Sequence, residues 1–302
     1  MLSNEPIVSP DASGSAESRT AAAKPRLKLV CRKIRDEDLD AVADCLTRGF
    51  PERSIAYWRR GLLRLRDRAV PESFPRYGYI LTADGAVVGI VLLIFAIADD
   101  GSVRANVSSW CVDDAYRGYS NMLLAAAFRA KDVTFFNISA SPWTLQVIEA
   151  QGFRPYVLGT FHAAAALGRR VPGADVRAVD ASTPDASSLL AEHAACGCIC
   201  LEVVYRGTAY PFVFLPSRSA GNRLPSAQLV YCRSLAEMAR FAGPVGRHLL
   251  RTGFVSIAID ATGPIPGLIG HYAVGKRMKY FRGPAAPRLG DLSATELVYL
   301  GP

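Results

Sequence analysis

The hydrophobic positions of the first hundred residues form blocks that predict strands and amphipathic helices. In residues 26–34, apolar side chains alternate with basic ones, which is the period of a half-buried strand. Asp36 is suited to cap a helix whose apolar positions recur every three to four residues. The turn Ala83-Asp84-Gly85 separates two apolar runs and predicts a hairpin. The expected elements are a strand at 26–34, helices after Asp36 and at 53–68, and strands at 77–82, 86–97 and 103–112.

Residues 107–131 combine a strand with a helix that follows it almost directly. The strand part is rich in β-branched and aromatic residues, and an alanine-rich helical pattern covers 119–131. Arg117-Gly118 lies between them, where the backbone must turn sharply. A helix start presents backbone N–H groups and the positive end of the helix dipole, so this turn is suited to bind a phosphate, with Arg117 adding a positive charge. An ordinary strand-to-helix connection explains the pattern equally well, and both interpretations stay open.

The rest of the chain repeats the order of the first part. After a linker at 168–173, the pattern again predicts strand, helix, hairpin, strand, helix and strand. No Arg-Gly turn lies between Cys232 and Leu235, so this half is expected to lack a phosphate site. The expected elements are strands at 176–179, 199–205, 210–215, 228–232, 254–260, 270–280 and 295–300, a helix at 184–194, and a helix at 235–250 broken at Gly243-Pro244.

Composition describes a globular chain of two domains. Its 302 residues are 50% hydrophobic and 21% charged, enough for a large core in two domains of about 150 residues each. Residues 1–25 are rich in Ser, Ala and Pro without periodicity, which predicts a disordered tail. The longest apolar run, 86–98, is too short for a membrane span, and the N-terminus lacks the pattern of a secretory signal. We therefore expect no membrane span and a cytoplasmic location.

The seven cysteines and the net charge of +8 exclude some classes of function. An odd number of cysteines inside apolar segments is typical of a reducing compartment. The segment CGCIC at 196–200 has no nearby second ligand pair, so we expect no metal. The charge is concentrated only in helix 53–68, whose Arg60, Arg64 and Arg68 form a row. This row is either a solvated face or a site for an acidic partner; without interleaved aromatic residues, nucleic acid is not expected.

Two motifs resemble the GNAT family of acyl-coenzyme A N-acyltransferases. VDDAYRG at 112–118 is similar to the family's strand end V-x-P-x-Y-R-G, and LQVIEAQGF at 145–153 is similar to its helix ending L-Y-E-K-L-G-F. An expected strand at 132–140 separates them, as in the family, where it runs parallel to the strand ending at Val112 and splays from it. The resemblance covers about residues 26–167.

The resemblance implies an α/β (α+β) fold of two GNAT-like domains, each a mixed, mostly antiparallel central sheet flanked by helices. Domain 26–168 would hold the donor site, and domain 174–302 would be a degenerate repeat. The implied donor is acetyl-CoA or another acyl-CoA. The implied donor-binding residues are Cys111, Val112, Arg117, Gly118, Tyr119, Ser120, Asn121, Met122 and Ser141.

The catalytic groups are less clear from the resemblance. Acyl transfer needs a base for the incoming ammonium and an acid for the leaving thiolate. The family's acidic Tyr falls on Ile148, and strand 103–112 has no carboxylate. Ser109 and Tyr156 are the catalytic candidates, although packing or a simple hydrogen bond is an alternative role for each. A Cys111 nucleophile would need a base, for which His162 is nearest in sequence.

The expected function is therefore transfer of an acyl group from acyl-CoA to an amine of a small molecule. One alternative uses a longer acyl chain carried by acyl carrier protein, which the arginine row would bind. A second alternative is a noncatalytic acyl-CoA-binding protein. Neither the acceptor, the acyl length nor the oligomeric state follows from the sequence.

Overall fold

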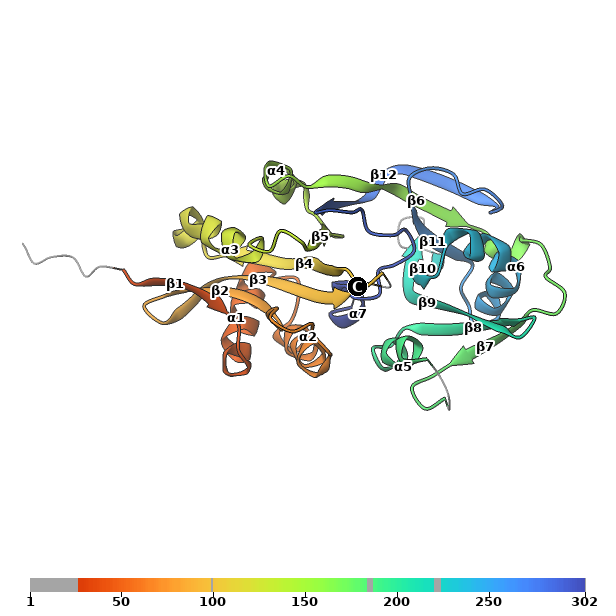
Figure 1. Cartoon of the computed structure of the whole chain (residues 1–302), viewed down its shortest axis with the longest axis horizontal. Helices are drawn as coiled ribbons and strands as arrows, with labels where there is room; N and C mark the ends of the chain where they lie inside the picture. Colours follow the sequence, from red (N-terminus) through yellow and green to blue (C-terminus); the bar gives the residue numbers. More distant parts are fainter. Residues whose placement is uncertain (1–26, 99, 184–186, 220–223, 302) are drawn as a thin grey trace, which may run out of the picture.

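A single twelve-stranded β-sheet runs through both halves of the chain (Figure 1). The computed structural model describes residues 27–98, 100–183, 187–219 and 224–301, so the tail expected at 1–25 lies outside the described residues. The strands of the first half are β1 (Leu29–Lys33), β2 (Gly78–Ala83), β3 (Ala86–Ile97), β4 (Val103–Val112), β5 (Thr134–Asn137) and β6 (Arg154–Ala163). Those of the second half are β7 (Asp175–Val179), β8 (Ile199–Tyr205), β9 (Thr208–Ser219), β10 (Leu224–Cys232), β11 (Ser256–Ala261) and β12 (Gly270–Arg282).

Helices cover both faces of the sheet in each half. In the first half, α1 and α2 pack on one face and α3 and α4 on the other; in the second, α6 packs on one face and α5 on the other. The α-helices are α1 (Leu39–Gly49), α2 (Ile55–Asp67), α3 (Ser120–Ala127), α4 (Pro142–Ala150), α5 (Ser188–Ala195), α6 (Leu235–Arg251) and α7 (Glu296–Tyr299). The 3-10 helices are η1 (Asp36–Asp38), η2 (Asp114–Tyr119) and η3 (Ala165–Leu167).

The two halves of the sheet have the same strand order: five strands follow one another in chain order inward from each edge, and the sixth comes from the other half. The sheet runs β1-β2-β3-β4-β5-β12-β6-β11-β10-β9-β8-β7, and among the described strands only β4–β5 and β10–β11 pair in parallel. The last strand of each half is exchanged: β12 of the second half pairs with β5 of the first, and β6 of the first half pairs with β11 of the second. The predicted mixed, mostly antiparallel sheet is therefore confirmed, and the two halves are interlocked through β6 and β12.

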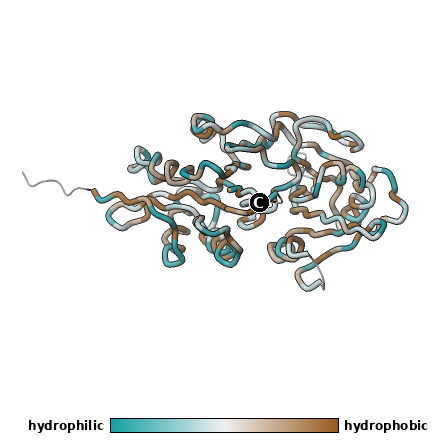
Figure 2. The backbone as a smooth tube through the Cα atoms, in the orientation of Figure 1, coloured by the Kyte–Doolittle hydropathy of each residue, from teal (hydrophilic) through white to brown (hydrophobic). Residues whose placement is uncertain are grey.

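The most apolar strand of the sequence lies in the middle of the first half. From Val88 to Phe95, β3 is buried throughout, because α1 and α2 cover one of its faces and α3 the other. A strand covered on both faces reads as a continuous apolar run rather than an alternating one. Figure 2 shows hydrophobic residues following the strands, with hydrophilic ones on outward helix turns.

Three expected elements differ from the structure. Helix α6 continues through Gly243-Pro244 instead of breaking there. The linker packs tightly against it at this place, since a Cβ on Gly243 would lie 2.0 Å from the carbonyl oxygen of Arg169.

The other two differences are in the length and the type of an element. The helix expected at 119–131 is α3, which is shorter and follows the 3-10 helix η2. The strand expected at 295–300 was wrong, because this stretch contains the helical turn α7.

The C-terminal segment, residues 289–301, passes from the second half to the first and ends near the centre of the molecule (Figure 1). A buried ion pair lies near its beginning: the Arg104 guanidinium of β4 donates to both carboxylate oxygens of Asp291, at 2.8 and 2.9 Å, and to Ser293 Oγ at 2.8 Å. Burial by itself raises the pKa of Asp291, but the charge and hydrogen bonds of Arg104, with those of Ser293, lower it overall.

Helix α2 holds the end of the C-terminal segment. Arg64 donates to the carbonyl oxygen of Tyr299 at 3.4 Å, and the Arg68 guanidinium lies 5.7 Å from the centre of the Tyr299 ring. Arg68 also donates to the carbonyl oxygens of Phe95 and Arg76, and burial lowers its pKa to about 10. Of the three arginines in the expected row, only Arg60 is therefore an exposed side chain, and Arg64 and Arg68 are partly buried.

We predict that Asp291→Ala lowers the free energy of unfolding by about 3 kcal/mol or more, because it leaves a buried guanidinium without its counter-charge. Urea denaturation at neutral pH measures this change. The contribution of the ionised Asp291 is present above the unfolded-state pKa of about 4 and is lost as the pH falls through the lower folded-state value.

The matched control is Asp175→Ala. Asp175 pairs with Arg177 at 2.8 Å, but both side chains are exposed on the edge strand β7. Its removal is expected to cost less than about 1 kcal/mol. Equal effects of the two substitutions would contradict the importance of the buried pair.

Candidate active site

Strands β4 and β5 run parallel and then separate. Their pairing begins at Arg104 with Thr134 and ends at Asn106 with Phe136, while β4 continues to Val112 along β3. The expected parallel pairing is confirmed. Beyond Asn106, the edge of β4 that faces β5 is no longer paired with that strand, and exposed backbone groups of such an edge can bind an extended ligand as an added strand does.

A β-bulge lies in β4 just where the strands separate. Val107 faces Leu93 and Trp110 faces Val91, so Ser108 and Ser109 together lie opposite the single residue between those partners. A bulge changes which side chains point to each face. Trp110 accordingly packs on the α3 face with Val107, whereas Cys111 packs on the α1 face.

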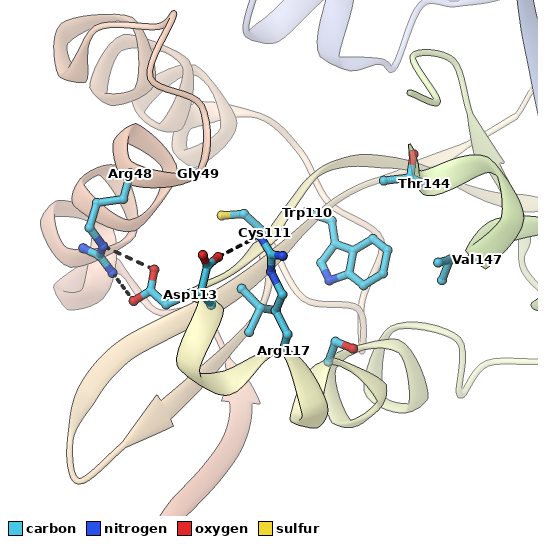
Figure 3. A pocket seen from close by; sticks show the side chains of 11 residues that line it. Arg48, Gly49, Trp110, Cys111, Asp113, Arg117, Thr144 and Val147 are labelled. Atoms are coloured by element: carbon cyan, nitrogen blue, oxygen red, sulfur yellow. Dashed lines mark hydrogen bonds and ion pairs between the residues drawn. The ribbon is translucent and has the colours of Figure 1, made fainter. Parts of the chain in front are cut away.

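A cavity of about 980 Å³ lies beyond the end of β4, and we call it the donor cavity because it is lined by residues expected to bind the donor (Figure 3). It is bordered by the C-terminus of α1, the end of β4, η2, the first residue of α3 and helix α4. Four of the expected donor-binding residues, Cys111, Val112, Arg117 and Ser120, come together here. The full lining is Arg48, Gly49, Trp110, Cys111, Val112, Asp113, Asp114, Arg117, Ser120, Thr144 and Val147.

Two arginines bring positive charge to the donor cavity, and each has a carboxylate partner. Arg48 pairs with Asp113 at 2.8 Å, and Arg117 pairs with Asp114 at 2.7 Å (Figure 3). The second pair is the more exposed, with 73% and 87% of the two side chains accessible. An exposed pair is weak, so a phosphate can compete with Asp114 for Arg117.

The other expected donor-binding residues do not line this cavity. Gly118, Tyr119, Asn121 and Met122 lie on η2 and the start of α3, and their side chains or backbone are exposed. The sharp turn expected at Arg117-Gly118 is instead part of a 3-10 helix. A Cβ on Gly118 would meet no atom within 4 Å, so packing does not require a glycine at this position.

A gap cavity of about 120 Å³ lies between the separated strands. It shares Trp110, Thr144 and Val147 with the donor cavity. Ser141, the remaining expected donor residue, borders it and caps α4 by accepting the Thr144 N–H at 3.3 Å. The polar side chains around the gap cavity are Ser108, Ser109, Asn137, Ser139, Ser141, Thr144, Gln151 and Glu296.

Glu296 brings a carboxylate into the gap from the far end of the chain. It is the first residue of α7, and its backbone N–H donates to Asn106 Oδ1 at 2.9 Å. Its two carboxylate oxygens accept hydrogen bonds from Ser108 on β4 and from Ser139 just after β5. Burial raises its pKa, although these two hydrogen bonds and the charge of Lys279 act in the opposite direction.

Glu296 was not among the predicted site residues, because a catalytic carboxylate was expected only on strand 103–112. Glu296 lies 188 residues from its partner Ser108 and belongs to a segment that was expected to be a strand. No local pattern connects the two. The available signal was a single acidic residue directly before the apolar run LVYL.

A third cavity, of about 540 Å³, lies on the other side of the gap cavity and is lined by residues of both halves; we call it the interdomain cavity. It shares the lining residues Ser139 and Ala140 with the gap cavity. Leu297, the residue after Glu296, also lines it. Its remaining lining comes from the beginning of α4 and from β9, β10 and β12 of the second half. The donor, gap and interdomain cavities are therefore neighbours, with the Glu296 carboxylate in the middle one.

The two catalytic candidates lie in different places. Ser109 lines the gap cavity. Tyr156 lines none of the three cavities; it is buried, packs edge-on against Phe281 with ring centres 5.9 Å apart, and burial raises its pKa strongly. The geometry therefore places Tyr156 in the core and not beside a bound donor.

Cys111 is not set up as a nucleophile. Its Sγ lies 3.7 Å from the carbonyl oxygen of Cys45, and interaction with Cys45 together with burial raises its pKa. The base considered for it, His162, is on β6, three strands away from β4, or about 14 Å at the usual strand spacing. His162 is therefore too far from Cys111 to act as the base that the acyl-enzyme interpretation needs.

The corresponding gap in the second half is filled by the chain itself. Strand β10 also pairs in parallel with β11 only as far as Gln228, and it also carries a bulge, at Val230. There, the Leu292 N–H donates to the Val230 carbonyl at 2.7 Å, and the Cys232 N–H donates to the Gly290 carbonyl at 2.8 Å. Residues 290–292 thus occupy the free edge of β10, and Ser234 caps α6 where a phosphate turn would lie.

Within the described parts of the chain, no helix is long and apolar enough to cross a membrane. In the same residues, no three or more His, Cys, Asp or Glu side chains form a group that could hold a metal ion. In the CGCIC segment, Cys198 and Cys200 are buried thiols whose pKa values burial raises to about 12.

Comparison of the fold with solved structures identifies it as that of the GCN5-related N-acetyltransferases. Such an enzyme from Anabaena variabilis is similar with a TM-score of 0.57 and 10% identity, covering 84% of this chain and 72% of that one. One from Kribbella flavida gives a TM-score of 0.54 and 16% identity, with 85% and 71% covered. Eis1 from Mycobacterium abscessus gives 0.51 and 12%, with 88% and 74% covered.

No protein-family model and no curated protein matches the chain. The structural similarity spans both halves, because each of the three matches covers more than four fifths of this chain. At these sequence identities, the similarity shows the GNAT fold but not the reaction that the protein catalyses.

We predict that Arg117→Glu weakens the binding of acetyl-CoA by about 2 kcal/mol or more, because it places a negative charge beside the donor's pyrophosphate. Isothermal titration calorimetry on the full chain measures the affinity.

Arg177→Glu is the matched control, since Arg177 is also an exposed arginine paired with a nearby aspartate, but on the outermost strand β7. It should bind acetyl-CoA like the wild type. Equal affinities for Arg117→Glu and Arg177→Glu would remove the donor's phosphates from η2.

Proposed function

We propose that the protein transfers an acyl group from acyl-CoA directly to an amine of a small molecule. The observation that carries this proposal is the Glu296 carboxylate, held between two separated strands and between two larger cavities. The donor's phosphates would lie on η2 and the start of α3, and its pantetheine along the free edge of β4. The thioester would then reach the gap cavity, beside Ser109 and Glu296.

Glu296 suits the role of general base. The amine of an acceptor is protonated at neutral pH and must lose a proton before it attacks the thioester carbonyl. A carboxylate whose pKa is raised by burial accepts that proton more readily than an exposed one. The nitrogen then bonds to the carbonyl carbon. As the tetrahedral intermediate collapses, the C–S bond breaks, and the nitrogen loses its surplus proton to the Ser109 hydroxyl group as that group protonates the leaving thiolate.

The remaining proton transfer is assigned to hydroxyl groups of the gap. The leaving thiolate needs a proton, and Ser109 remains our proposed donor because it lines the same cavity. Backbone N–H groups at the β4 bulge would stabilise the oxyanion, as a strand edge bent by a bulge can aim several donors at one point.

The same site supports direct transfer better than the two alternatives. A noncatalytic acyl-CoA-binding protein gains nothing from a carboxylate in the thioester gap. An acyl carrier protein would need an exposed basic surface, and Arg64 and Arg68 are engaged with backbone carbonyls. We therefore retain acyl-CoA as the proposed donor and an amine as the proposed acceptor.

We predict that Glu296→Gln lowers kcat for amine acetylation about 100-fold or more, because loss of a general base typically costs that much. A coupled assay of free coenzyme A release measures the rate. In the wild type, kcat/KM should fall as the pH falls through the raised pKa of Glu296, because only the ionised form accepts a proton. This acid limb should be absent in Glu296→Gln.

Acetyl-CoA affinity is the check that the variant remains folded, since the donor's phosphates bind elsewhere. Glu149→Gln is the control, because Glu149 is an exposed glutamate of α4 that lines none of the three cavities. Full activity in Glu296→Gln would overturn the proposed base.

A further inference from the structure

The interdomain cavity is large, mostly apolar and positively charged at one side. Its first-half wall consists of the end of β5, the start of α4 and Leu297; its second-half wall consists of β9, β10 and β12. Apolar side chains dominate the lining: Ile138, Leu145, Leu215, Met278, Tyr280 and Leu297. The volume of about 540 Å³ is within the range of pockets for small organic ligands.

Two cationic side chains line this cavity, but only one is available to a ligand. Lys279 is buried and pairs with Asp260 at 3.1 Å. Arg277 is exposed, and its Nη1 donates to Gln228 Oε1 at 3.3 Å. Among the described residues, no carboxylate lies within ion-pair distance of Arg277. Since a guanidinium has five N–H donors, most of those of Arg277 remain for a bound molecule.

The backbone of β12 is distorted so that it presents Arg277. Pairing of β12 with β6 is interrupted between Val274 and Lys279. In that interval Gly275 has φ +70° and Arg277 has φ +53°, a left-handed conformation that is unfavourable for a residue with a side chain. A strained residue of this kind within a pocket wall indicates that its position is used.

The charges on the two sides of the cavity are opposite. Glu296 is adjacent to the first-half wall, through the shared residues Ser139 and Ala140, and Arg277 lies on the second-half wall. A molecule with an ammonium group and a carboxylate matches this arrangement, with its amine directed to the gap and its carboxylate to Arg277. Arginine suits the second contact because it binds a carboxylate through two parallel hydrogen bonds.

We propose that the acceptor is an amine with an apolar body and a carboxylate, and that Arg277 of the second half binds the carboxylate. This inference rests on the proposed acyl transfer and adds the substrate class to it. It also gives the second half a function: it supplies the wall that selects the acceptor.

The test compares 4-(2-aminoethyl)benzoate with phenethylamine, which has the same ring and amine but no carboxylate, using acetyl-CoA as donor. In the first compound the amine and the carboxylate lie at opposite ends of an apolar ring, as the cavity requires. Arg277→Gln should lower kcat/KM for 4-(2-aminoethyl)benzoate about tenfold or more, the usual effect of losing a hydrogen bond to a charged group. It should leave kcat/KM for phenethylamine within about twofold of the wild type. Lys276→Gln is the matched control, because Lys276 is the neighbouring exposed cation and does not line the cavity.

A binding measurement separates failure of this inference from failure of the proposed reaction. 4-(2-Aminoethyl)benzoate is titrated by calorimetry into the protein saturated with coenzyme A, which requires no turnover. If no amine is acetylated but Arg277→Gln weakens the binding of this compound, the reaction is wrong and the carboxylate site stands. If both amines respond equally to Arg277→Gln, or if 4-(2-aminoethyl)benzoate does not bind the wild type, the carboxylate site is overturned.

Discussion

The arrangement of the site depends on one buried ion pair. Arg104 lies on β4 within the short stretch paired with β5, and Asp291 lies in the C-terminal segment after the last strand. Their bidentate contact directs the segment across the middle of the sheet, and five residues later Glu296 enters the gap between β4 and β5. Removing either partner would leave a buried charge, so the path of the segment is strongly determined.

The two halves put the same structural feature to different uses. Each has a parallel strand pair that separates after three residues and a bulge at the point of separation. In the second half, residues 290–292 bind the open edge of β10; at Gly290 an added Cβ would lie only 2.7 Å from Cys232 Sγ, so the fit is close. In the first half, the segment contributes a side chain to the gap and leaves the cavity beyond it open.

Local sequence signals predicted the strands and helices that have strong periodicity. The bounds of 86–97 and 103–112 agree with β3 and β4, and Arg117 and Ser120, two of the residues expected to bind the donor, line the cavity beyond β4. What local signals did not contain was the exchange of β6 and β12, or the position of Glu296. Both depend on contacts between residues more than ninety positions apart, for which a single sequence has no periodic pattern. Tyr156 shows the converse, since a chemically suitable residue close to a motif is buried elsewhere because its strand pairs with β11 and β12.

A crystal structure of the complex with acetyl-CoA would test the central claim most directly. We expect one molecule per chain, with its pyrophosphate on η2 and α3 and its thioester in the gap cavity, close enough to Glu296 for one intervening amine, or about 3 to 5 Å. Acetyl-CoA bound along β10 in the second half, or bound with its thioester away from Glu296, would contradict the account.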